Sequence, residues 1–229
     1  MKPTLIVTRP AAQGAAFGAQ FGQYANVILS PLIEIVPKPV AINLTEIAGF
    51  VFTSVHGVNA ANLPAGFPAF CVGPKTALAA AAKGLDVMVG PGDASGLVKS
   101  IVARGICGPL AHLRGRHTSG NVAQNLSDSG VPCSDYVAYE QVAIDLNDAA
   151  KDALRGKNSV VLPLFSPRTA TILSAKGRFL APVHLVVMSN KVKEAAKTVD
   201  VVSITVAAQP TGAAMVDATV ARLLALQSD

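Results

Sequence analysis

The chain has 229 residues, of which 51% are hydrophobic and 14% are charged, and none is Trp. A chain of this length forms one large or two small domains and needs no disulfide or metal to stabilise them. The composition excludes a disordered or collagen-like chain. The mean hydropathy is +0.44, but Gly, Pro, Lys or Asp interrupts each apolar run before the ~20 residues that a membrane-spanning helix needs. The N-terminal apolar run is too short for a signal-peptide core, so we expect a cytoplasmic protein with no membrane partner.

The chain carries a net charge of +5, from 19 Lys and Arg against 14 Asp and Glu. Such a surplus favours an anionic partner but does not identify one. The basic residues form no Lys/Arg-rich run, and no aromatic platform accompanies them, so we expect no nucleic-acid partner. A small polyanionic metabolite fits the charge better.

The cysteines and histidines do not have the spacing of a metal site. Cys71, Cys107 and Cys133 are odd in number and far apart in the sequence, which argues against zinc ligation or a disulfide framework. We expect all three to be buried as small apolar residues. The histidines are expected on the surface or hydrogen-bonded in the core. They are His56, His112, His117 and His184.

Short apolar runs alternate with helix-length segments along the whole chain. In the first half, strands are expected at 5–7, 27–29, 49–52, 69–72, 87–89 and 111–113, and helices at 12–24, 75–83, 94–104 and 121–129. In the second half, strands are expected at 160–162, 184–187 and 201–205, and helices at 146–155, 168–176, 192–197 and 211–226. Strands that are apolar throughout are buried on both faces, as in parallel sheets built from βαβ units. The pattern therefore predicts an α/β fold.

The two halves of the chain resemble each other. Phe50–Ser54 and Leu162–Ser166 are both apolar strands that end in Ser before a helix, and Cys71–Lys75 and Val187–Lys191 follow them at nearly the same distance. We infer two similar α/β domains with parallel sheets. Ligands of such sheets bind beyond the carboxyl ends of the strands, and two domains would enclose a cleft.

Two extended segments mark the domain boundaries. Residues 34–40 and 134–145 alternate apolar and polar side chains and flank the segment 41–133. If they pair as antiparallel linker strands, the chain crosses from one domain to the other and returns. The first domain then consists of residues 1–33 and 146–229, and the second of residues 41–133.

One loop has the appearance of a phosphate-binding turn. Gly90–Gly96 follows a strand and opens a helix, but its spacing departs from the dinucleotide fingerprint and Pro91 lacks a backbone donor. No P-loop, nucleophile elbow or catalytic carboxylate pair is present in the sequence. Arg168 and Lys191 lie just past predicted strand ends, where helix N-termini offer free N–H groups to carboxylates.

Short motifs spread over the chain together resemble the uroporphyrinogen-III synthase family. They are Thr8–Pro10, Pro31–Ile35, Phe52–Val58, Val72–Ala77 with Gly84, Gly92–Leu97, Leu113–Gly115, Val137–Tyr139, Phe165–Ala170 and Pro210–Met215. The resemblance implies two α/β domains joined by a two-stranded linker with the active-site cleft between them, which agrees with the pattern above.

The resemblance also implies a reaction. The substrate is hydroxymethylbilane, a linear tetrapyrrole with many carboxylates, and the product is uroporphyrinogen III, a precursor in heme biosynthesis. Such a lyase eliminates water, inverts ring D through a spiro intermediate and closes the macrocycle, with no cofactor and no metal. The protein would act by holding the substrate so that attack at the substituted position of ring D is faster than closure without inversion. We expect a monomer that makes at most a transient contact with hydroxymethylbilane synthase.

The resemblance assigns roles to individual residues. Tyr139 matches the tyrosine of the family's linker strand and is the expected catalytic residue, as a general acid for departure of hydroxide. The expected substrate-binding residues are Arg9, Thr53, Ser54, Thr76, Ser95, Ser166, Arg168, Lys191 and Thr211. Val192 stands where many members have Thr, and residues 117–120 show no family signature.

Three alternatives stay open at this point. A family relative without activity would keep the fold and lose the reaction. A non-catalytic two-domain binding protein would close around a small polyanion. A nucleotide-dependent transferase would use Gly90–Gly96 and would be stabilised by nucleotide.

Overall fold

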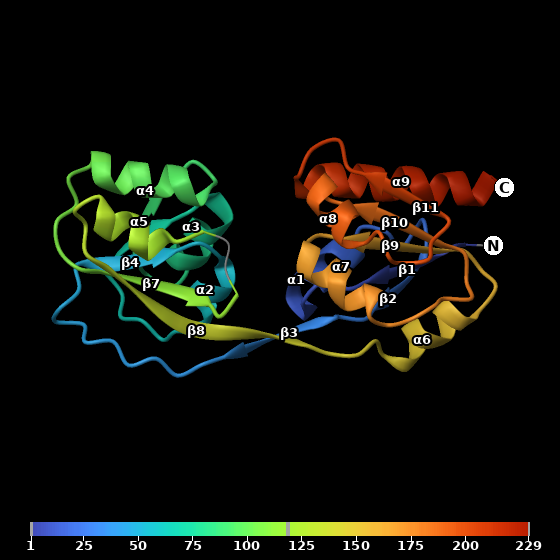
Figure 1. Cartoon of the computed structure of the whole chain (residues 1–229), viewed down its shortest axis with the longest axis horizontal. Helices are drawn as coiled ribbons and strands as arrows, with labels where there is room; N and C mark the ends of the chain where they lie inside the picture. Colours follow the sequence, from blue (N-terminus) through green and yellow to red (C-terminus); the bar gives the residue numbers. More distant parts are fainter. Residues whose placement is uncertain (1, 118–119, 229) are drawn as a thin grey trace. The chain divides into compact units, whose positions relative to one another are not determined.

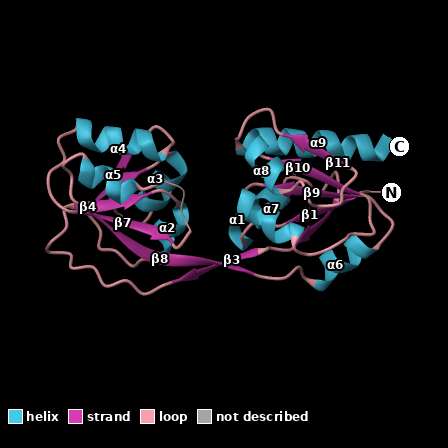
Figure 2. Ribbon diagram, in the orientation of Figure 1, coloured by secondary structure: helices cyan, strands magenta, loops and turns pink. Residues whose placement is uncertain are grey.

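The computed structural model of the chain describes residues 2–117 and 120–228, which form two compact units (Figure 1). Unit 1 ends at Glu34 and resumes at Val142, and unit 2 is the continuous stretch Ile35–Gln141. Both are α/β units with a central sheet covered by helices on its two faces (Figure 2). The predicted fold class is therefore confirmed.

Unit 1 contains a five-stranded parallel sheet in the order β11-β10-β9-β1-β2. Its strands are β1 Thr4–Val7, β2 Asn26–Leu29, β9 Val160–Leu164, β10 Val183–Val187 and β11 Ser203–Val206. Its helices are α1 Ala11–Gly18, α6 Asp148–Arg155, α7 Pro167–Ser174, α8 Asn190–Ala195 and α9 Gly212–Ser228.

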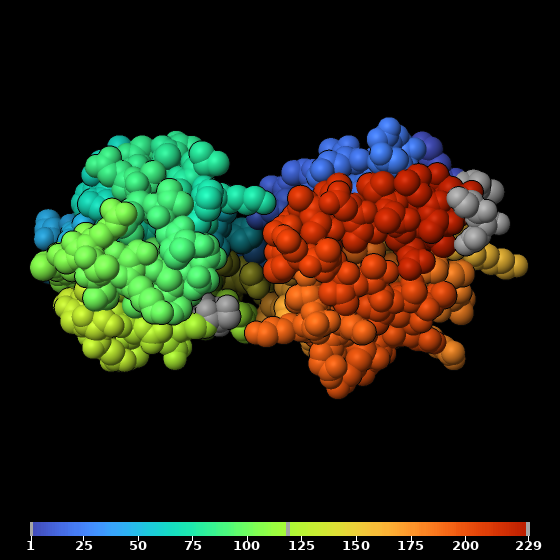
Figure 3. All heavy atoms as spheres, turned by 90° about the horizontal axis from the view of Figure 1, so that it is seen from above, coloured from blue at the N-terminus to red at the C-terminus, as the bar shows by residue number. Residues whose placement is uncertain are grey.

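Neighbouring residues of each strand in unit 1 enter different cores, because side chains alternate between the faces of a sheet. Ile6 and Leu162 pack on the side of α6, α7 and α8. Leu5 and Val161 pack on the side of α1 and α9. Figure 3 shows the blue N-terminal residues beside the red C-terminal helix on this second side. Burial on both faces accounts for the uninterrupted apolar strands.

Unit 2 contains a six-stranded sheet in the order β3-β8-β7-β4-β5-β6. Its strands are β3 Ile33–Pro37, β4 Gly49–Phe52, β5 Pro68–Cys71, β6 Asp86–Val89, β7 Leu110–Gly115 and β8 Cys133–Ala143. Its helices are α2 Val55–Ala60, α3 Pro74–Ala81, α4 Ala94–Ala103 and α5 Val122–Asp128. Phe50 and Phe52 pack on the side of α2 and α3, whereas Val51 packs on the side of α4 and α5.

Strands β3 and β8 carry the chain across the boundary between the units. The Lys38 N–H donates to the Ala138 carbonyl at 2.8 Å, and the Ile144 N–H donates to the Leu32 carbonyl at 3.0 Å. One strand advances along the sequence as the other recedes, so the pair is antiparallel. All the other pairs described in this sheet are parallel.

Two expectations from the sequence are wrong. The first helix ends at Gly18 and not near residue 24, because the chain turns there to bury Phe21 completely. Cys107 is exposed, since it lies in the loop that follows Gly105, whereas Cys71 is buried and Cys133 is half-buried. In the described part of the chain, no helix combines the length and apolar character needed to cross a membrane.

Candidate active site

The expected site residues of each unit lie at or near the carboxyl edge of its parallel strands. In unit 2, Thr53 and Ser54 follow β4, Thr76 follows β5 and Ser95 follows β6, while Tyr139 lies on β8. In unit 1, Arg9 follows β1, Ser166 and Arg168 follow β9, Lys191 follows β10 and Thr211 follows β11. This edge is where ligands bind to sheets of this type.

Tyr139 and Ser54 form a hydrogen-bonded pair in unit 2. The Ser54 Oγ lies 2.9 Å from the Tyr139 hydroxyl. Ser54 is also the N-cap of α2, and its Oγ accepts a hydrogen bond from the Gly57 N–H at 3.3 Å. Tyr139 is 5% exposed, whereas Ser54 is half-buried. Of the two residues, Ser54 is thus the more exposed.

Two neighbours hold the Tyr139 ring in place. A Cβ atom added at Gly115 would lie 2.8 Å from two carbon atoms of the ring, so only glycine leaves room for it there. The His56 ring packs against it at a centroid distance of 5.6 Å with a tilt of 55°. The register between β7 and β8 shifts between Arg114 and Gly115, which sets Gly115 opposite Tyr139.

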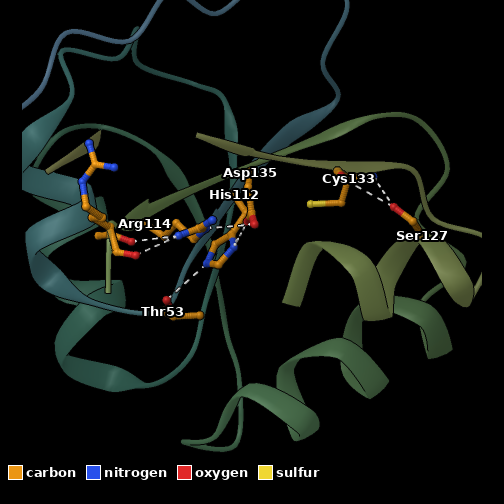
Figure 4. Close-up of polar contacts among 8 residues, drawn as sticks. Thr53, His112, Arg114, Ser127, Cys133 and Asp135 are labelled. Atoms are coloured by element: carbon orange, nitrogen blue, oxygen red, sulfur yellow. Dashed lines mark hydrogen bonds and ion pairs between the residues drawn. The ribbon is translucent and has the colours of Figure 1, made fainter. Parts of the chain in front are cut away.

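Thr53 belongs to a chain of polar contacts that the sequence did not suggest (Figure 4). Its Oγ1 lies 3.2 Å from His112 Nε2, and His112 Nδ1 lies 2.8 Å from Asp135 Oδ1. Arg114 Nε is 2.9 Å from Asp135 Oδ2, an ion-pair distance without the alignment of a hydrogen bond. His112 is 1% exposed, and this burial lowers its pKa despite the nearby carboxylate.

Thr76 and Ser95 open the next two helices along the sheet. Thr76 lies in the first turn of α3 and is 5% exposed, so little of it is open to a ligand. Ser95 lies in the first turn of α4 and is exposed. The N-cap of α4 is Asp93, whose carboxylate accepts from the Gly96 N–H at 2.8 Å. A negative charge already occupies this helix N-terminus, which disfavours phosphate binding by the Gly90–Gly96 loop.

Arg9 stacks on an aromatic side chain of unit 1. Its guanidinium carbon lies 3.9 Å from the centroid of the Phe165 ring, and Phe165 meets Phe17 edge-on at 5.0 Å. Partial burial lowers the pKa of Arg9, but an arginine keeps its charge at neutral pH. The stacking fixes this cation at the carboxyl end of β1.

The other expected residues of unit 1 also lie at helix starts. Ser166 is the N-cap of α7, and its Oγ accepts from the Thr169 N–H at 3.1 Å. Arg168 is half-buried in the first turn of α7. Lys191 is exposed in the first turn of α8, and Thr211, also exposed, accepts from the Ala214 N–H at 3.2 Å before α9. These residues combine hydroxyls and cations, which suits a substrate that carries carboxylates.

A basic pocket elsewhere in unit 1 contains none of the expected residues. It has a volume of about 200 Å³, and Lys151 and Lys176 line it together with Asp145. Both lysines pair with Asp145, at 2.8 and 2.9 Å, and lower the pKa of its carboxyl group. The two arginines that line the pocket also have carboxylate partners, Arg155 with Asp152 and Arg178 with Asp200. Among residues 2–117 and 120–228, no three His, Cys, Asp or Glu side chains gather so as to hold a metal ion.

Nothing in the sequence pointed to His112, Asp135 or Gly115 as parts of this site. His112 and Asp135 face each other on parallel strands, and they are 23 residues apart in the sequence. Only the register of β7 against β8 brings them together, and no spacing within the sequence reveals that register. His112 does fit the expectation of a hydrogen-bonded core histidine.

Comparisons with known proteins agree with the resemblance. A family profile described as uroporphyrinogen-III synthase HemD matches residues 18–217. The uroporphyrinogen-III synthetase of Helicobacter pylori 26695 is 17% identical with a TM-score of 0.69, and each chain is covered completely. A mutant uroporphyrinogen III synthase of the extremely thermophilic bacterium Thermus thermophilus is 14% identical with a TM-score of 0.52, again over both whole chains.

At such low identities the two structures establish a shared fold, and no curated protein matches the sequence. The family profile covers most of the chain. Together with the hydroxyl-rich carboxyl edges described above, it confirms the resemblance: this chain belongs to the uroporphyrinogen-III synthase family.

Proposed function

We propose that this chain is an active uroporphyrinogen-III synthase, a lyase that converts hydroxymethylbilane into uroporphyrinogen III with loss of water and inversion of ring D. Family membership supports the reaction. The observation that links this reaction to particular residues is the contact of 2.9 Å between the hydroxyl groups of Ser54 and Tyr139. It joins the phenol, as the proposed proton source, to the hydroxyl of Ser54, the more exposed of the two residues.

The first step is cleavage of the bond between carbon and oxygen in the hydroxymethyl group. Its oxygen leaves with the bonding electrons and needs a proton to depart as water. Ser54 Oγ can donate one hydrogen bond and accept two. It accepts from Gly57 and, in this proposal, from Tyr139, and its own hydrogen points to the leaving oxygen. The proton of Tyr139 is thus relayed through Ser54.

The remaining steps need no further reagent. Loss of water leaves a cationic methylene group that the adjacent pyrrole nitrogen stabilises. The substituted carbon of ring D attacks it to give the spiro intermediate, and rearrangement with ring closure releases one proton, which restores Tyr139. The protein selects this attack over closure at the unsubstituted carbon by holding the substrate in one geometry.

In this proposal the other expected residues bind and orient the substrate. Arg9, Arg168 and Lys191 supply cations for the substrate's carboxylates, and the remaining hydroxyls supply hydrogen bonds. In this proposal both domains, residues 1–33 with 146–229 and residues 41–133, supply substrate-binding residues. Because the free bilane closes to the wrong isomer without the enzyme, a transient contact with hydroxymethylbilane synthase would shorten its exposure to solvent. The monomeric state and cytoplasmic location also stay predictions.

The test couples the purified protein to hydroxymethylbilane synthase and porphobilinogen, which generate the labile substrate in place. After oxidation, uroporphyrin isomers I and III are separated by chromatography. We expect mainly isomer III, whereas the control without the protein yields isomer I. If a folded sample leaves isomer I unchanged, the proposal is wrong, and binding of a polyanion without catalysis becomes the better interpretation. The family match gives no support to that alternative at present.

A further inference from the structure

The contacts of His112 determine which of its ring nitrogens carries hydrogen. Asp135 Oδ1 lies 2.8 Å from His112 Nδ1. An ionised carboxylate can only accept hydrogen bonds, so Nδ1 is the protonated nitrogen. His112 Nε2 is the atom that faces Thr53.

The surroundings of His112 favour a neutral ring. The negative charge of Asp135 is already balanced by Arg114, 2.9 Å from its other oxygen. Helices α4 and α5 cover this face of the sheet with apolar residues such as Leu97 and Val122. Cys133, on the same strand as Asp135, has a thiol whose pKa is raised to about 12, so it adds no charge. Burial also lowers the pKa of His112 itself.

A neutral ring with hydrogen on Nδ1 has only a lone pair at Nε2. The Thr53 hydroxyl must then donate its hydrogen to His112, across 3.2 Å. The lone pairs of the Thr53 oxygen can then accept a hydrogen bond from a ligand. Thr53 is half-buried, whereas His112, at 1% exposed, is shielded from direct contact with a ligand.

We propose that His112 and Asp135 are positioning residues that fix Thr53 as a hydrogen-bond acceptor, so that Thr53 binds a pyrrole N–H of the substrate and not a carboxylate. This inference rests on the proposed function. A tetrapyrrole offers both kinds of group: its carboxylates only accept hydrogen bonds, and its pyrrole nitrogens donate them. Ser54, the next residue, keeps its hydrogen for the ligand. Two adjacent hydroxyls thus present opposite hydrogen-bond polarity.

The test reverses the direction of the hydrogen bond between Thr53 and His112 with little change in side-chain shape. In Asp135→Asn, the new amide can donate to His112 Nδ1, so the ring hydrogen moves to Nε2 and Thr53 must accept it. A two-bond ¹H–¹⁵N correlation spectrum reports the tautomer of His112 without any need for activity. We expect hydrogen on Nδ1 in the parent protein and on Nε2 in the variant. Asp128→Asn, at an exposed carboxylate bonded to Gln124, is the control and should leave the tautomer unchanged.

Kinetics then connect the tautomer to the substrate. Asp135→Asn and the nearly isosteric Thr53→Val should each raise KM about threefold to tenfold, the usual effect of one neutral hydrogen bond, with little change in kcat. Thr53→Ser should restore KM, and the double variant should be no worse than Thr53→Val. Thr53→Val also tests the inference if Asp135→Asn fails to fold.

Two results would overturn this inference while the proposed function stands. One is hydrogen on Nε2 in the parent protein, and the other is an unchanged KM in Thr53→Val while isomer III is still formed. If the parent protein forms no isomer III, the proposed function fails, and the assignment of Thr53 to a pyrrole N–H fails with it whatever the spectrum shows.

Discussion

The hydroxyl groups of Ser54 and Tyr139 lie 2.9 Å apart, although 85 residues separate them in the sequence. One caps a short helix at the end of β4, and the other lies on a strand that carries the chain between the units. Neither residue is distinctive by itself. In the proposed mechanism, their contact passes a proton from the buried Tyr139 to the more exposed Ser54.

The relay predicts that Tyr139→Phe loses most activity without unfolding. Loss of a general acid lowers the rate by about 10²- to 10⁴-fold, whereas loss of one hydrogen bond costs about 1 kcal/mol of stability. Initial rates of isomer III formation and thermal unfolding give both quantities. Tyr136→Phe, on the same strand, should retain full activity. Near-normal turnover in Tyr139→Phe would remove that residue from the mechanism.

Ser54→Ala should reduce the rate as strongly as Tyr139→Phe, and the double variant should be little worse than either, because residues that act as one unit are not additive. Ser54→Thr keeps both the hydroxyl and the helix cap and should recover much of the rate. Additive losses in the double variant would show that Ser54 and Tyr139 act separately. Ser54→Ala alone also removes a cap, at a cost of about 1 kcal/mol, so unfolding is measured alongside.

Gly115→Ala should displace the Tyr139 ring. The added Cβ would lie 2.8 Å from ring carbon atoms, closer than such contacts allow. Overpacking of this kind costs about 1–3 kcal/mol, and we expect a lower melting temperature together with loss of isomer III. The control is Gly22→Ala, where a Cβ would meet nothing within 4 Å. Unchanged stability and activity in Gly115→Ala would mean that the ring is not held as described.

Ser166→Ala should raise KM and also destabilise unit 1. The variant removes the cap of α7, which costs about 0.5–2 kcal/mol. Asn147→Ala removes the cap of α6 and is the matched control for the loss of stability. Only Ser166→Ala should change KM. Equal KM values in the two variants would assign Ser166 to the fold alone.

Stability should decrease when the pH falls from 7.5 to 5. Burial lowers the pKa of both His112 and His184 below the ordinary value of 6.5. In this range the unfolded chain binds more protons than the folded one, so acid favours unfolding, by at most about 1.4 kcal/mol per pH unit for each group. The carboxylate of Asp145, whose pKa is lowered by Lys151 and Lys176, adds to this only below about pH 4.

Urea unfolding at several pH values measures this effect. His112→Gln and His184→Gln should each flatten the dependence. A protein equally stable at pH 5 and 7.5 would contradict the prediction.

The sequence predicted the elements of the fold well because their signals are local. Uninterrupted apolar strands follow from burial, and Ser54 and Ser166 stand out where two such strands end, although only the family resemblance predicted that they bind substrate. His112 and Asp135 depend on strand register instead, and the space for Tyr139 depends on a register shift at Gly115. Such features arise only when the sheet is assembled.

The insertion of unit 2 into unit 1 also sets an order of assembly during synthesis on the ribosome. Strand β1 pairs with β9, with Thr4 opposite Val160, and a strand cannot pair before its partner has been made. Unit 2, a continuous stretch that ends at Gln141, is complete while β9, β10 and β11 are still to be added. The strand that bears Tyr139 can thus take its place before the sheet that carries Arg9 and Ser166 exists. Unit 1 can fold only after nearly the whole chain has been synthesised. Its folding is also slow, because its strands pair over long separations in the sequence.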